Sequence, residues 1–337
     1  MKKRLLTVAI VAAMIASLAG CSNGDNKTDA KADTTTETTA DTGKENEKDK
    51  DYVIGCVLIS GTIQHCQLFK QGFEETCAAN GAEAVVLDAN YDPQVLISSI
   101  NDLVAKGCDG IVVESCDANA PLAAIKEAAN AGVVVAAADM YLDISEEDGT
   151  VISQTVSDNY SGGYECGEDV VKRADGKDFN VCIMELQTNT SAVDRVKGFQ
   201  DAIEGHDNIK VLDIGTPNPE NLEQKVAVCD AWVEKFDKID AIFCYHDPAA
   251  IACVSSLKAA GRLENTFIYS VDGNEENLIA IKNGEVTGSA KQDPYKMAQA
   301  STEDIFTVLN GGAIDHDYLT KVPITYVDAS NVDEFLK

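Results

Sequence analysis

The side chains of this chain that could most readily bind a ligand or catalyse a reaction come directly after short apolar runs. Two carboxylates, Asp139 and Asp272, each come directly after such a run, and Gln292 follows another. If the runs are parallel strands, their carboxyl ends meet at one edge of a sheet, and ligands bind beyond that edge. The positions to inspect are therefore His65, Cys66, Glu114, Asp139, Met140, His246, Asp272 and Gln292.

Some of these side chains could bind a metal. His65, Cys66, Glu114 and His246 offer nitrogen, sulfur and oxygen ligands that folding could bring together. Their spacing matches no recognised zinc pattern, and the chain has no Cys-x-x-Cys pair. We therefore expect no resident metal and no cofactor, and a metal ligand stays open as an alternative.

Paired carboxylates could also act as a catalytic acid and base. Asp139 with Asp272 or Glu114 would suit glycoside cleavage. The chain has no Gly-x-Ser-x-Gly elbow, no phosphate-binding loop and no His-Glu-x-x-His motif, so an extracellular enzyme is the less favoured alternative. Acids just past a strand are also common helix N-caps, and we predict that role for Asp117, Asp158 and Asp247.

Short β-branched runs alternate with longer amphipathic segments from residue 51 onward. In the first half we predict strands at 52–60, 84–87, 110–113 and 133–138, and helices at 68–80, 94–106 and 121–131. In the second half we predict strands at 151–156, 180–184, 210–213, 241–244, 267–271, 286–290 and 323–327, and helices at 161–173, 191–204, 220–236, 248–260, 275–283 and 295–309. Continuous apolar strands separated by helices predict an α/β fold with two doubly wound parallel-sheet lobes.

The first residues have the pattern of an export signal. Met1-Lys2-Lys3-Arg4 is followed by an uncharged stretch, 5–19, which is too short to span a bilayer core of about 30 Å as a helix. Leu18-Ala19-Gly20-Cys21 resembles the cleavage site of bacterial lipoproteins, which implies removal of signal peptide 1–20 and acylation of Cys21. We therefore expect an extracytoplasmic protein that is anchored to the cell membrane by lipid.

A polar segment, 21–51, is expected to tether the folded part to that anchor. From Ser22 to Asp51 it contains no Leu, Ile, Val, Met or aromatic residue, so it cannot bury apolar surface and is predicted to be disordered. The whole chain carries 27 basic and 56 acidic residues, a net charge of −29. Such a surface repels nucleic acid, which we exclude as a partner.

Ten cysteines follow Cys21, and most lie inside or directly after apolar runs such as 181–184 and 241–243. A chain of this length can build a core without disulfides, so we interpret these cysteines as small core residues. An even number of cysteines in an exported protein nevertheless leaves their pairing open.

Several motifs occur in an order that is typical of one family. They are Lys70-Gln71-Gly72-Phe73, residues 100–107, Ser157-Asp158-Asn159 with Gly162-Gly163, Glu185-Leu186-Gln187, Thr190-Ser191-Ala192, residues 195–199 and Val271-Asp272-Gly273. Over nearly all of 52–327 the chain resembles the ribose/galactose-type (type I) periplasmic binding proteins. The resemblance implies a monomeric, non-enzymatic receptor whose lobes close on a small sugar and pass it to the permease of an ABC importer. It implies one lobe of residues 51–157 and 293–321 and another of 158–292 and 322–337, joined by a three-crossover hinge.

The resemblance also implies a set of ligand contacts. They fall on His65, Cys66, Glu114, Asp139, Met140, Arg195, Glu220, His246, Asp272 and Gln292. The residues that match the ribose-type pattern are Asp139, Arg195, Asp272 and Gln292. Carboxylates and a planar guanidinium can each engage two adjacent hydroxyls. A wrong epimer would leave buried groups unpaired, at a cost of about 1 to 3 kcal/mol each.

The other positions depart from that pattern. In it, paired aromatics stand at His65 and Cys66, asparagines at Glu114 and His246, an arginine at Met140 and an aromatic near Glu220. The departures add carboxylates and remove a stacking platform, although His65 or Tyr141 could still supply a flat face. A polyol, a furanose or an amine-bearing ligand therefore fits better than ribose itself, and a nucleoside-like ligand stays open. A transcription regulator with the same lobes is excluded by the export signal and the absence of DNA-binding helices before Tyr52.

Overall fold

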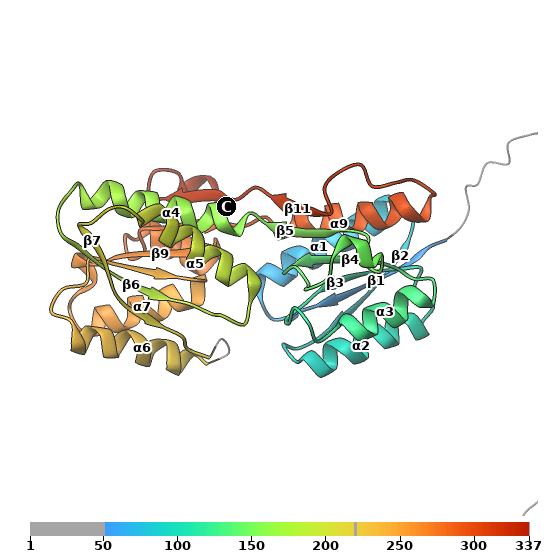
Figure 1. Cartoon of the computed structure of the whole chain (residues 1–337), viewed down its shortest axis with the longest axis horizontal. Helices are drawn as coiled ribbons and strands as arrows, with labels where there is room; N and C mark the ends of the chain where they lie inside the picture. The colour runs from blue at the N-terminus through green and yellow to red at the C-terminus, as the bar shows by residue number, and fades with distance from the viewer. Residues whose placement is uncertain (1–50, 219–220, 337) are drawn as a thin grey trace, which may run out of the picture. The chain divides into compact units, whose positions relative to one another are not determined.

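The computed structural model describes residues 51–218 and 221–336, and this part of the chain contains two six-stranded sheets covered by helices (Figure 1). The first sheet has the order β11-β5-β4-β3-β1-β2 and is parallel throughout. Its strands are β1 (Val53–Leu58), β2 (Glu83–Asp88), β3 (Gly110–Glu114), β4 (Val134–Asp139), β5 (Gln154–Ser157) and β11 (Leu319–Val322). Its helices are α1 (Gln64–Ala79), α2 (Pro93–Ala105), α3 (Leu122–Asn130) and α9 (Pro294–Leu309).

The second sheet has the order β12-β10-β9-β8-β6-β7, and only β12 runs antiparallel to its neighbour. Its strands are β6 (Phe179–Met184), β7 (Ile209–Gly215), β8 (Ala241–Cys244), β9 (Phe267–Asp272), β10 (Gly288–Lys291) and β12 (Thr325–Asp328). Its helices are α4 (Asn159–Ala174), α5 (Thr190–Ile203), α6 (Leu222–Lys235), α7 (Asp247–Ala259) and α8 (Glu275–Lys282). Short 3-10 turns occur at Glu146–Asp148, Leu263–Asn265 and Val332–Glu334.

Burial on both faces explains the parallel sheets. Every residue of β3 is buried, and the first sheet has one buried cluster around Leu96 and Ile100 of α2 and another around Phe69 of α1 and Met297 of α9. The helices begin where the sequence places caps. The Asp92 carboxylate accepts a hydrogen bond from the backbone N–H of Gln94 at 2.7 Å, with Pro93 at the first helical position. The predicted fold class of two doubly wound lobes is confirmed.

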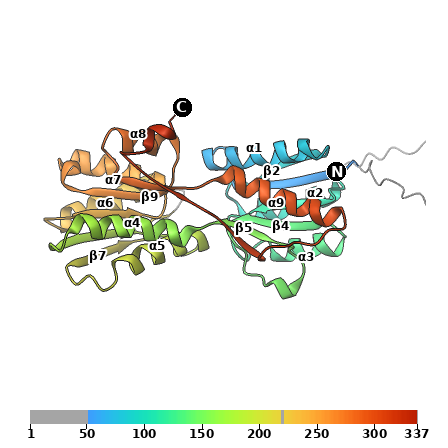
Figure 2. The same cartoon turned by 90° about the horizontal axis from the view of Figure 1, so that it is seen from above.

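The chain passes between the two sheets at three places in the described residues (Figure 2). It leaves the first sheet after Ser157 of β5 and enters α4, returns after Lys291 of β10 into α9, and leaves again between β11 and β12. Ser157 and Val322 are neighbours in the β5–β11 ladder, so the first and third connections start side by side. The exact lobe boundaries stay a prediction.

The last strand is more complicated than the sequence predicts. We expected one strand at 323–327, whereas the structure has β11 in the first sheet and then β12 in the second. In β11 only Val322 is buried, so this edge strand lacks the apolar run that identifies the others. Pairing with β5, a contact distant in sequence, makes it a strand.

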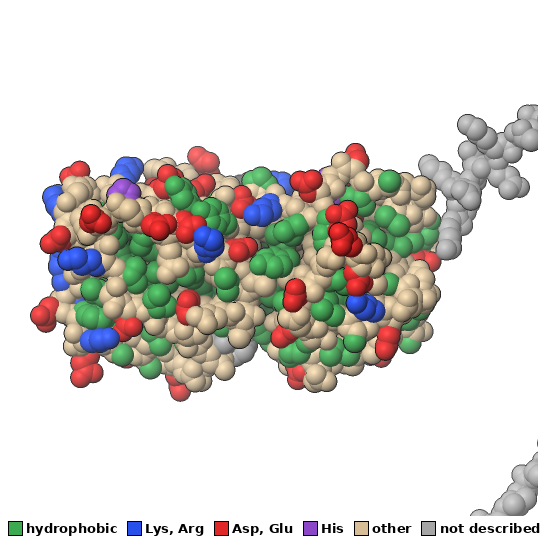
Figure 3. All heavy atoms as spheres, viewed as in Figure 1, with side chains coloured by type: hydrophobic (Ala, Val, Ile, Leu, Met, Phe, Trp, Pro, Cys, Tyr) green, Lys and Arg blue, Asp and Glu red, His purple; other side chains and the backbone are tan. Residues whose placement is uncertain are grey.

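The surface and the thiols match the composition. Acidic side chains are spread over the face shown in Figure 3, with fewer basic ones between them. Nine cysteines of the described part are buried free thiols, as predicted for core residues. None of the helices in this part combines the length and the apolar composition of a membrane span. Residues 1–50 lie outside the described residues; they include the predicted signal peptide, Cys21 and all of the predicted tether except Asp51. The signal peptide, the tether and the acylation of Cys21 stay predictions.

Candidate functional site

A cavity of about 260 Å³ lies where strand ends of the two sheets come together. Asp139 ends β4 in the first sheet, Asp272 ends β9 in the second, and both line this cavity. His65 comes from the start of α1, and His246 is the N-cap residue of α7. The site thus uses the carboxyl ends of parallel strands, as ligand sites in doubly wound folds do.

Both cavity aspartates have a backbone conformation that L-residues rarely adopt. The φ angle is 71° at Asp139 and 135° at Asp272. Such conformations are strained and persist only where surrounding contacts hold them, which is common at ligand sites. Both aspartates adopt these conformations where they line the cavity.

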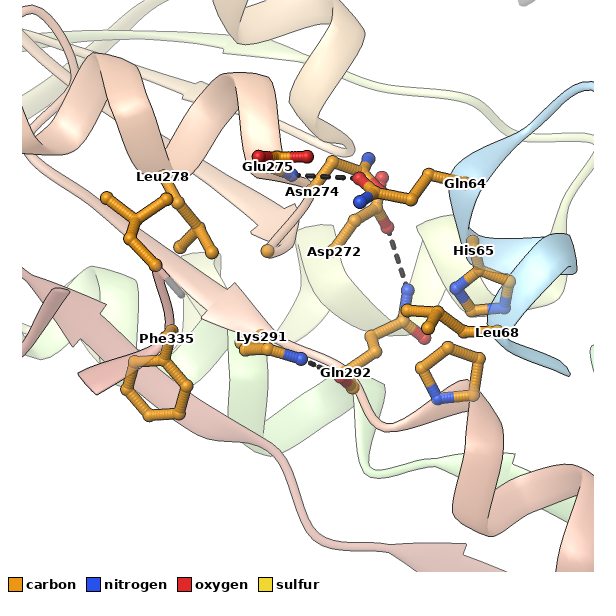
Figure 4. Close-up of a pocket in the computed structure, with 13 residues that line it drawn as sticks. Gln64, His65, Leu68, Asp272, Asn274, Glu275, Leu278, Lys291, Gln292 and Phe335 are labelled. Atoms are coloured by element: carbon orange, nitrogen blue, oxygen red, sulfur yellow. Dashed lines mark hydrogen bonds between the residues drawn. The ribbon is translucent and has the colours of Figure 1, made fainter. Parts of the chain in front are cut away.

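In the second lobe, Asp272 is held by a buried network. The guanidinium Nη1 of Arg195 lies 3.0 Å from the Asp272 Oδ1 and also donates to the backbone carbonyl of Tyr245 at 2.9 Å. The Gln292 Nε2 donates to the same Asp272 oxygen at 2.8 Å (Figure 4). Burial raises the pKa of Asp272, and the neighbouring Arg195 opposes that shift.

A second carboxylate, that of Asp247, forms hydrogen bonds to the strands and the backbone next to Asp272. It accepts hydrogen bonds from the Ser270 hydroxyl at 2.7 Å, the Ser289 hydroxyl at 2.9 Å and the Asn274 backbone N–H at 2.7 Å. Its own backbone N–H donates to the Asp272 Oδ2 at 3.3 Å. The predicted N-cap role of Asp247 is therefore wrong, because its carboxylate joins β9 and β10 instead of capping α7. Burial, helped by Asp272, raises its pKa to about 8.

In the first lobe, His65 faces two carboxylates. Its Nε2 lies 2.8 Å from the Asp139 Oδ1 and 3.9 Å from the Glu114 Oε1. The other Glu114 oxygen accepts a hydrogen bond from the Ile59 backbone N–H at 2.9 Å. His65 is therefore paired with Asp139 at the wall of the cavity, while Glu114 lies behind it and is fully buried.

These contacts determine the charges of the cluster. Burial lowers the pKa of His65, but the Asp139 carboxylate outweighs burial and raises that pKa to about 9. Burial raises the pKa of Glu114 to about 7, with Asp139 adding to the shift and His65 opposing it. The pKa of Asp139 is lowered although burial opposes it, because His65 is so close. At neutral pH the cluster contains an imidazolium–carboxylate pair beside a carboxyl that is close to its titration point.

His65, Glu114 and Asp139 are also the described residues that could hold a metal. One ligand atom from each lies within 4.8 Å of the others. A protonated imidazole has no free lone pair for a metal, so the ion pair with Asp139 competes with metal binding. The group differs from the predicted metal alternative, because Asp139 takes part and neither Cys66 nor His246 does.

The structure brings most of the predicted ligand contacts together. Seven of them line the cavity: His65, Cys66, Asp139, Arg195, His246, Asp272 and Gln292. Glu114 and Met140 do not line it, and both are fully buried. Met140 follows the end of β4, and its ligand contact, like that of Glu114, stays a prediction. Glu220 lies outside the described residues.

Sequence reasoning missed several cavity residues. Tyr91, Asn189, Lys225 and Tyr245 all line the cavity, whereas Tyr141, considered as a flat face, does not. Tyr245 had a signal, because it ends the apolar run before His246. The others come from a loop, a helix cap and a helix interior, where no local pattern indicates a ligand site.

Two lining residues carry buried atoms suited to a ligand. Besides the Nε2 of His65, which is ion-paired with Asp139, the buried side-chain atoms of the described cavity residues that have no hydrogen-bond partner include the His246 Nδ1 and the Gln292 Oε1. Burial lowers the pKa of His246, with Lys225 and Arg195 adding to the shift, so its ring is neutral. Buried polar atoms are normally paired, and a polyhydroxylated ligand would provide partners for both.

Contacts between the lobes lie at the cavity and at a second pocket, drawn in Figure 4, which shares His65, Asp272 and Gln292 with it. The Glu275 backbone N–H in the second lobe donates to the Gln64 Oε1 in the first at 2.8 Å (Figure 4). On the other side, the Ser191 hydroxyl donates to the backbone carbonyl of Asp139 at 3.1 Å. In Figure 4 the ring of His65 faces the side of Gln292 and Asp272, so groups of both lobes confront each other across the site.

Comparison with protein families decides the affiliation. The family model described as a periplasmic binding protein domain matches residues 54–313. The chain belongs to the periplasmic binding protein family. Its relatives include ribose import binding proteins, which are named as binding proteins and not as enzymes, so the enzymatic alternative is set aside.

Two relatives illustrate the similarity. The ribose import binding protein of Bacillus subtilis (strain 168) is 23% identical over 265 residues, which cover 78% of this chain and 83% of the relative. A putative rhizopine-binding protein of Rhizobium meliloti is 27% identical over 275 residues, covering 80% of this chain and 87% of the relative. The predicted resemblance to ribose/galactose-type binding proteins is confirmed.

Solved structures agree on the fold. An ABC transporter periplasmic solute binding protein from Actinobacillus succinogenes 130z, with bound D-allose, superposes with a TM-score of 0.77 at 23% identity. The superposition covers 84% of this chain and 99% of that one. At this identity the match supports the two-lobed architecture.

Proposed function

We propose that this periplasmic binding protein takes up a monosaccharide or a related polyol in the cavity between its lobes. The observation that carries the proposal is that Asp139 of one lobe and Asp272 of the other line the same small cavity. Together with Arg195 and Gln292 they offer donors and acceptors at the spacing of adjacent hydroxyls. The volume of about 260 Å³ lies near the low end of ligand pockets and suits one small metabolite.

The charges favour an uncharged ligand. Asp139 is paired with His65 and Asp272 with Arg195, so the main charges of the cavity cancel in pairs. The ribose-type pattern has a pair of aromatic rings for stacking on a sugar at the positions of His65 and Cys66. This chain has no such pair there. A polyol or a furanose, which depend less on stacking against a flat ring, therefore fits this site better than a pyranose.

The proposed mechanism is closure about the three connections. Ligand contacts from both lobes favour the closed form by the difference in affinity between the two states. The closed complex would then be recognised by the permease of an ABC importer, and acylated Cys21 would keep the protein at the membrane. The family membership supports this partnership.

A thermal-shift screen tests the ligand class. We would screen pentoses, hexoses, polyols, amino sugars and nucleosides, because ligand at a hundred times its dissociation constant stabilises a protein by about 2.7 kcal/mol. We expect the largest shift from a sugar or polyol. A shift confined to nucleosides or to amines would replace the proposed ligand class, and unchanged compound recovered from the complex would agree with binding without turnover.

The anchor needs its own experiment. Cells fed a radiolabelled fatty acid should label the intact protein and fail to label the Cys21→Ser variant. Equal labelling of both proteins would rule out acylation at this position.

The cluster of His65, Glu114 and Asp139 supports one rival, a divalent cation. Treating the purified protein with a chelator separates the two. We expect neither the melting temperature nor the sugar affinity to change. A loss of either, restored by adding one metal, would favour the cation.

A further inference from the structure

One buried side chain links the first connection between the lobes to the arginine of the cavity. Asn159 begins α4, two residues after the end of β5, and is 3% exposed. Its Nδ2 donates to the backbone carbonyl of Ser157 at 3.1 Å, and its Oδ1 accepts from the Nε of Arg195 at 2.8 Å. A single amide thus contacts both the connecting strand and a residue that lines the cavity.

The two helices that carry these residues are packed backbone to backbone. A Cβ on Gly163 of α4 would overlap the carbonyl oxygen of Arg195, and a Cβ on Gly198 of α5 would overlap the carbonyl oxygen of Tyr160. The backbone at Arg195 therefore has little freedom to slide along α4. What is left to fix is the orientation of the long arginine side chain.

Asn159 supplies that orientation. The Nη1 of Arg195 contacts the Tyr245 carbonyl and Asp272, both on the second lobe, while the Nε bonds to Asn159. A guanidinium is planar, so contacts at Nε and Nη1 together fix the plane that it presents to a ligand. The Asn159 contact is the one that leads to the connection between the lobes.

A simple capping role does not account for the Asn159 side chain. The N-cap of α4 is Asp158, whose carboxylate accepts from the backbone N–H of Ser161 at 3.4 Å and from its hydroxyl at 2.7 Å. The Asn159 amide bonds instead to the Ser157 carbonyl and to Arg195.

We propose that Asn159 is a positioning residue that couples the cavity arginine to the first connection between the lobes. When a hydroxylated ligand engages Arg195, the bond to Asn159 resists rotation of the guanidinium and transmits the constraint to the Ser157 carbonyl. This coupling favours the interlobe geometry in which Arg195 and Asp139 can contact one ligand. The inference rests on the proposed function of the cavity.

Two substitutions separate the two bonds. Asn159→Ala removes both, whereas Asn159→Asp keeps an acceptor for the Arg195 Nε but replaces the donor that faces the Ser157 carbonyl. Ser161→Ala is the matched control, because it removes a hydrogen bond from the same turn of α4 without touching Arg195.

The first measurement needs no ligand. Backbone hydrogen exchange is followed by mass spectrometry in peptides that contain 154–158 or 190–203. In Asn159→Ala we expect faster exchange in both peptides, and in Asn159→Asp faster exchange in 154–158 only. Ser161→Ala should leave both peptides as in the unaltered protein. If Asn159→Ala also exchanges like the unaltered protein, the coupling does not exist.

The second measurement uses four probes, D-ribose, D-allose, xylitol and myo-inositol, titrated by calorimetry. For any probe that binds, we expect Asn159→Ala to raise the Kd at least about tenfold, as for loss of a hydrogen bond to a charged group. Asn159→Asp should recover part of the loss, and Ser161→Ala should bind normally. A Kd unchanged in Asn159→Ala would overturn the coupling. If no probe binds, the result contradicts the proposed function. The exchange experiment still decides the role of Asn159.

Discussion

Each cavity aspartate has a cationic partner in its own lobe. His65 lies 2.8 Å from Asp139, and Arg195 lies 3.0 Å from Asp272. A buried carboxylate without a partner would be costly, and these pairs remove most of that cost while leaving further lone pairs for a ligand. The chemistry of the site is therefore that of hydrogen bonding between neutralised groups, which suits hydroxyls.

Replacing these carboxylates by amides tests that reading. Asp139→Asn and Asp272→Asn should each weaken sugar binding at least about tenfold, or about 1.4 kcal/mol, because one acceptor of the pair becomes a donor. Asparagine is preferable to alanine, since it tolerates the positive φ angles of 71° and 135° better. Calorimetric titration provides the measurement, and Asp117→Asn, in a turn outside the cavity, is the control. Normal affinity in both cavity variants would place the ligand elsewhere.

The buried cluster of the first lobe should make stability depend on pH. His65 keeps its proton to about pH 9 when folded but loses it near 6.5 when unfolded, so its contribution is present below 6.5 and is lost as the pH rises through 9. Glu114, with a pKa of about 7, contributes below about 4.5 and loses that contribution through 7. Both effects lower the melting temperature as the pH rises, whereas the lowered pKa of His246 acts in the opposite direction below pH 6.5, so we expect the fall between pH 6.5 and 9.

Glu114→Gln provides the control for that prediction. It removes one of the titrating groups, so the melting temperature at pH 7 relative to that at pH 5 should be higher in this variant than in the unaltered protein. An identical change from pH 5 to 7 in both proteins would contradict the raised pKa of Glu114.

The cavity residues differ in how far sequence could predict them. Asp139 and Asp272 stand at the ends of apolar strands and match a family pattern, and both line the cavity. Tyr91 and Lys225 come from a loop and a helix whose approach to the site depends on tertiary packing. Met140 is buried and does not line the cavity, because a position next to a cavity residue in sequence does not determine which way its side chain points.

At the scale of elements, the close packing of α4 on α5 is the feature that holds the second half of the site. Gly163 and Gly198 allow the two backbones to touch, and Arg195 lies on the contacted stretch of α5. Small residues at such a contact are not interchangeable with larger ones, because a single methyl group meets a main-chain oxygen. The helix pair therefore transmits any change in its spacing to the cavity.

Gly163→Ala should consequently destabilise the protein and disturb the site. We expect a loss of roughly 1 to 3 kcal/mol, as for overpacking of a tight core contact. Urea denaturation measures the loss, and Glu168→Ala on the exposed side of α4 should cost far less. Equal stability of both variants would show that the helices can separate without penalty.

The elements also show where the sequence was insufficient. Strands with continuous apolar runs, such as β3, were predicted within a residue or so of their observed ends. β11 was missed because an exposed edge strand carries little apolar signal and depends on its partner β5. Tertiary pairing, which local composition does not encode, made the difference.

At the scale of the molecule, three connections join the two lobes within the described residues. Hydrogen bonds such as that from the Glu275 N–H to Gln64 cross between the lobes without help from a ligand. Contacts between the lobes themselves therefore contribute to the free-energy difference between the open and closed forms, and contacts with a ligand add to that difference.

Small-angle X-ray scattering should detect the closure of the lobes on the ligand. With the sugar or polyol selected by the thermal-shift screen at saturation, we expect the radius of gyration to decrease. The Asp272→Asn variant at the same ligand concentration should show a smaller decrease. A radius of gyration that is the same with and without ligand would argue against closure as the mechanism.

The nine sheltered thiols have a consequence for how the protein must be made and handled. Each is protected only while the chain stays folded, because burial rather than pairing keeps it reduced. Unfolding would bare all of them together, and in air their oxidation would compete with recovery of the native state. Renaturation from urea should accordingly give a good yield with a reductant and a poor one without it, and an equal yield in both conditions would show that oxidation does not compete with refolding.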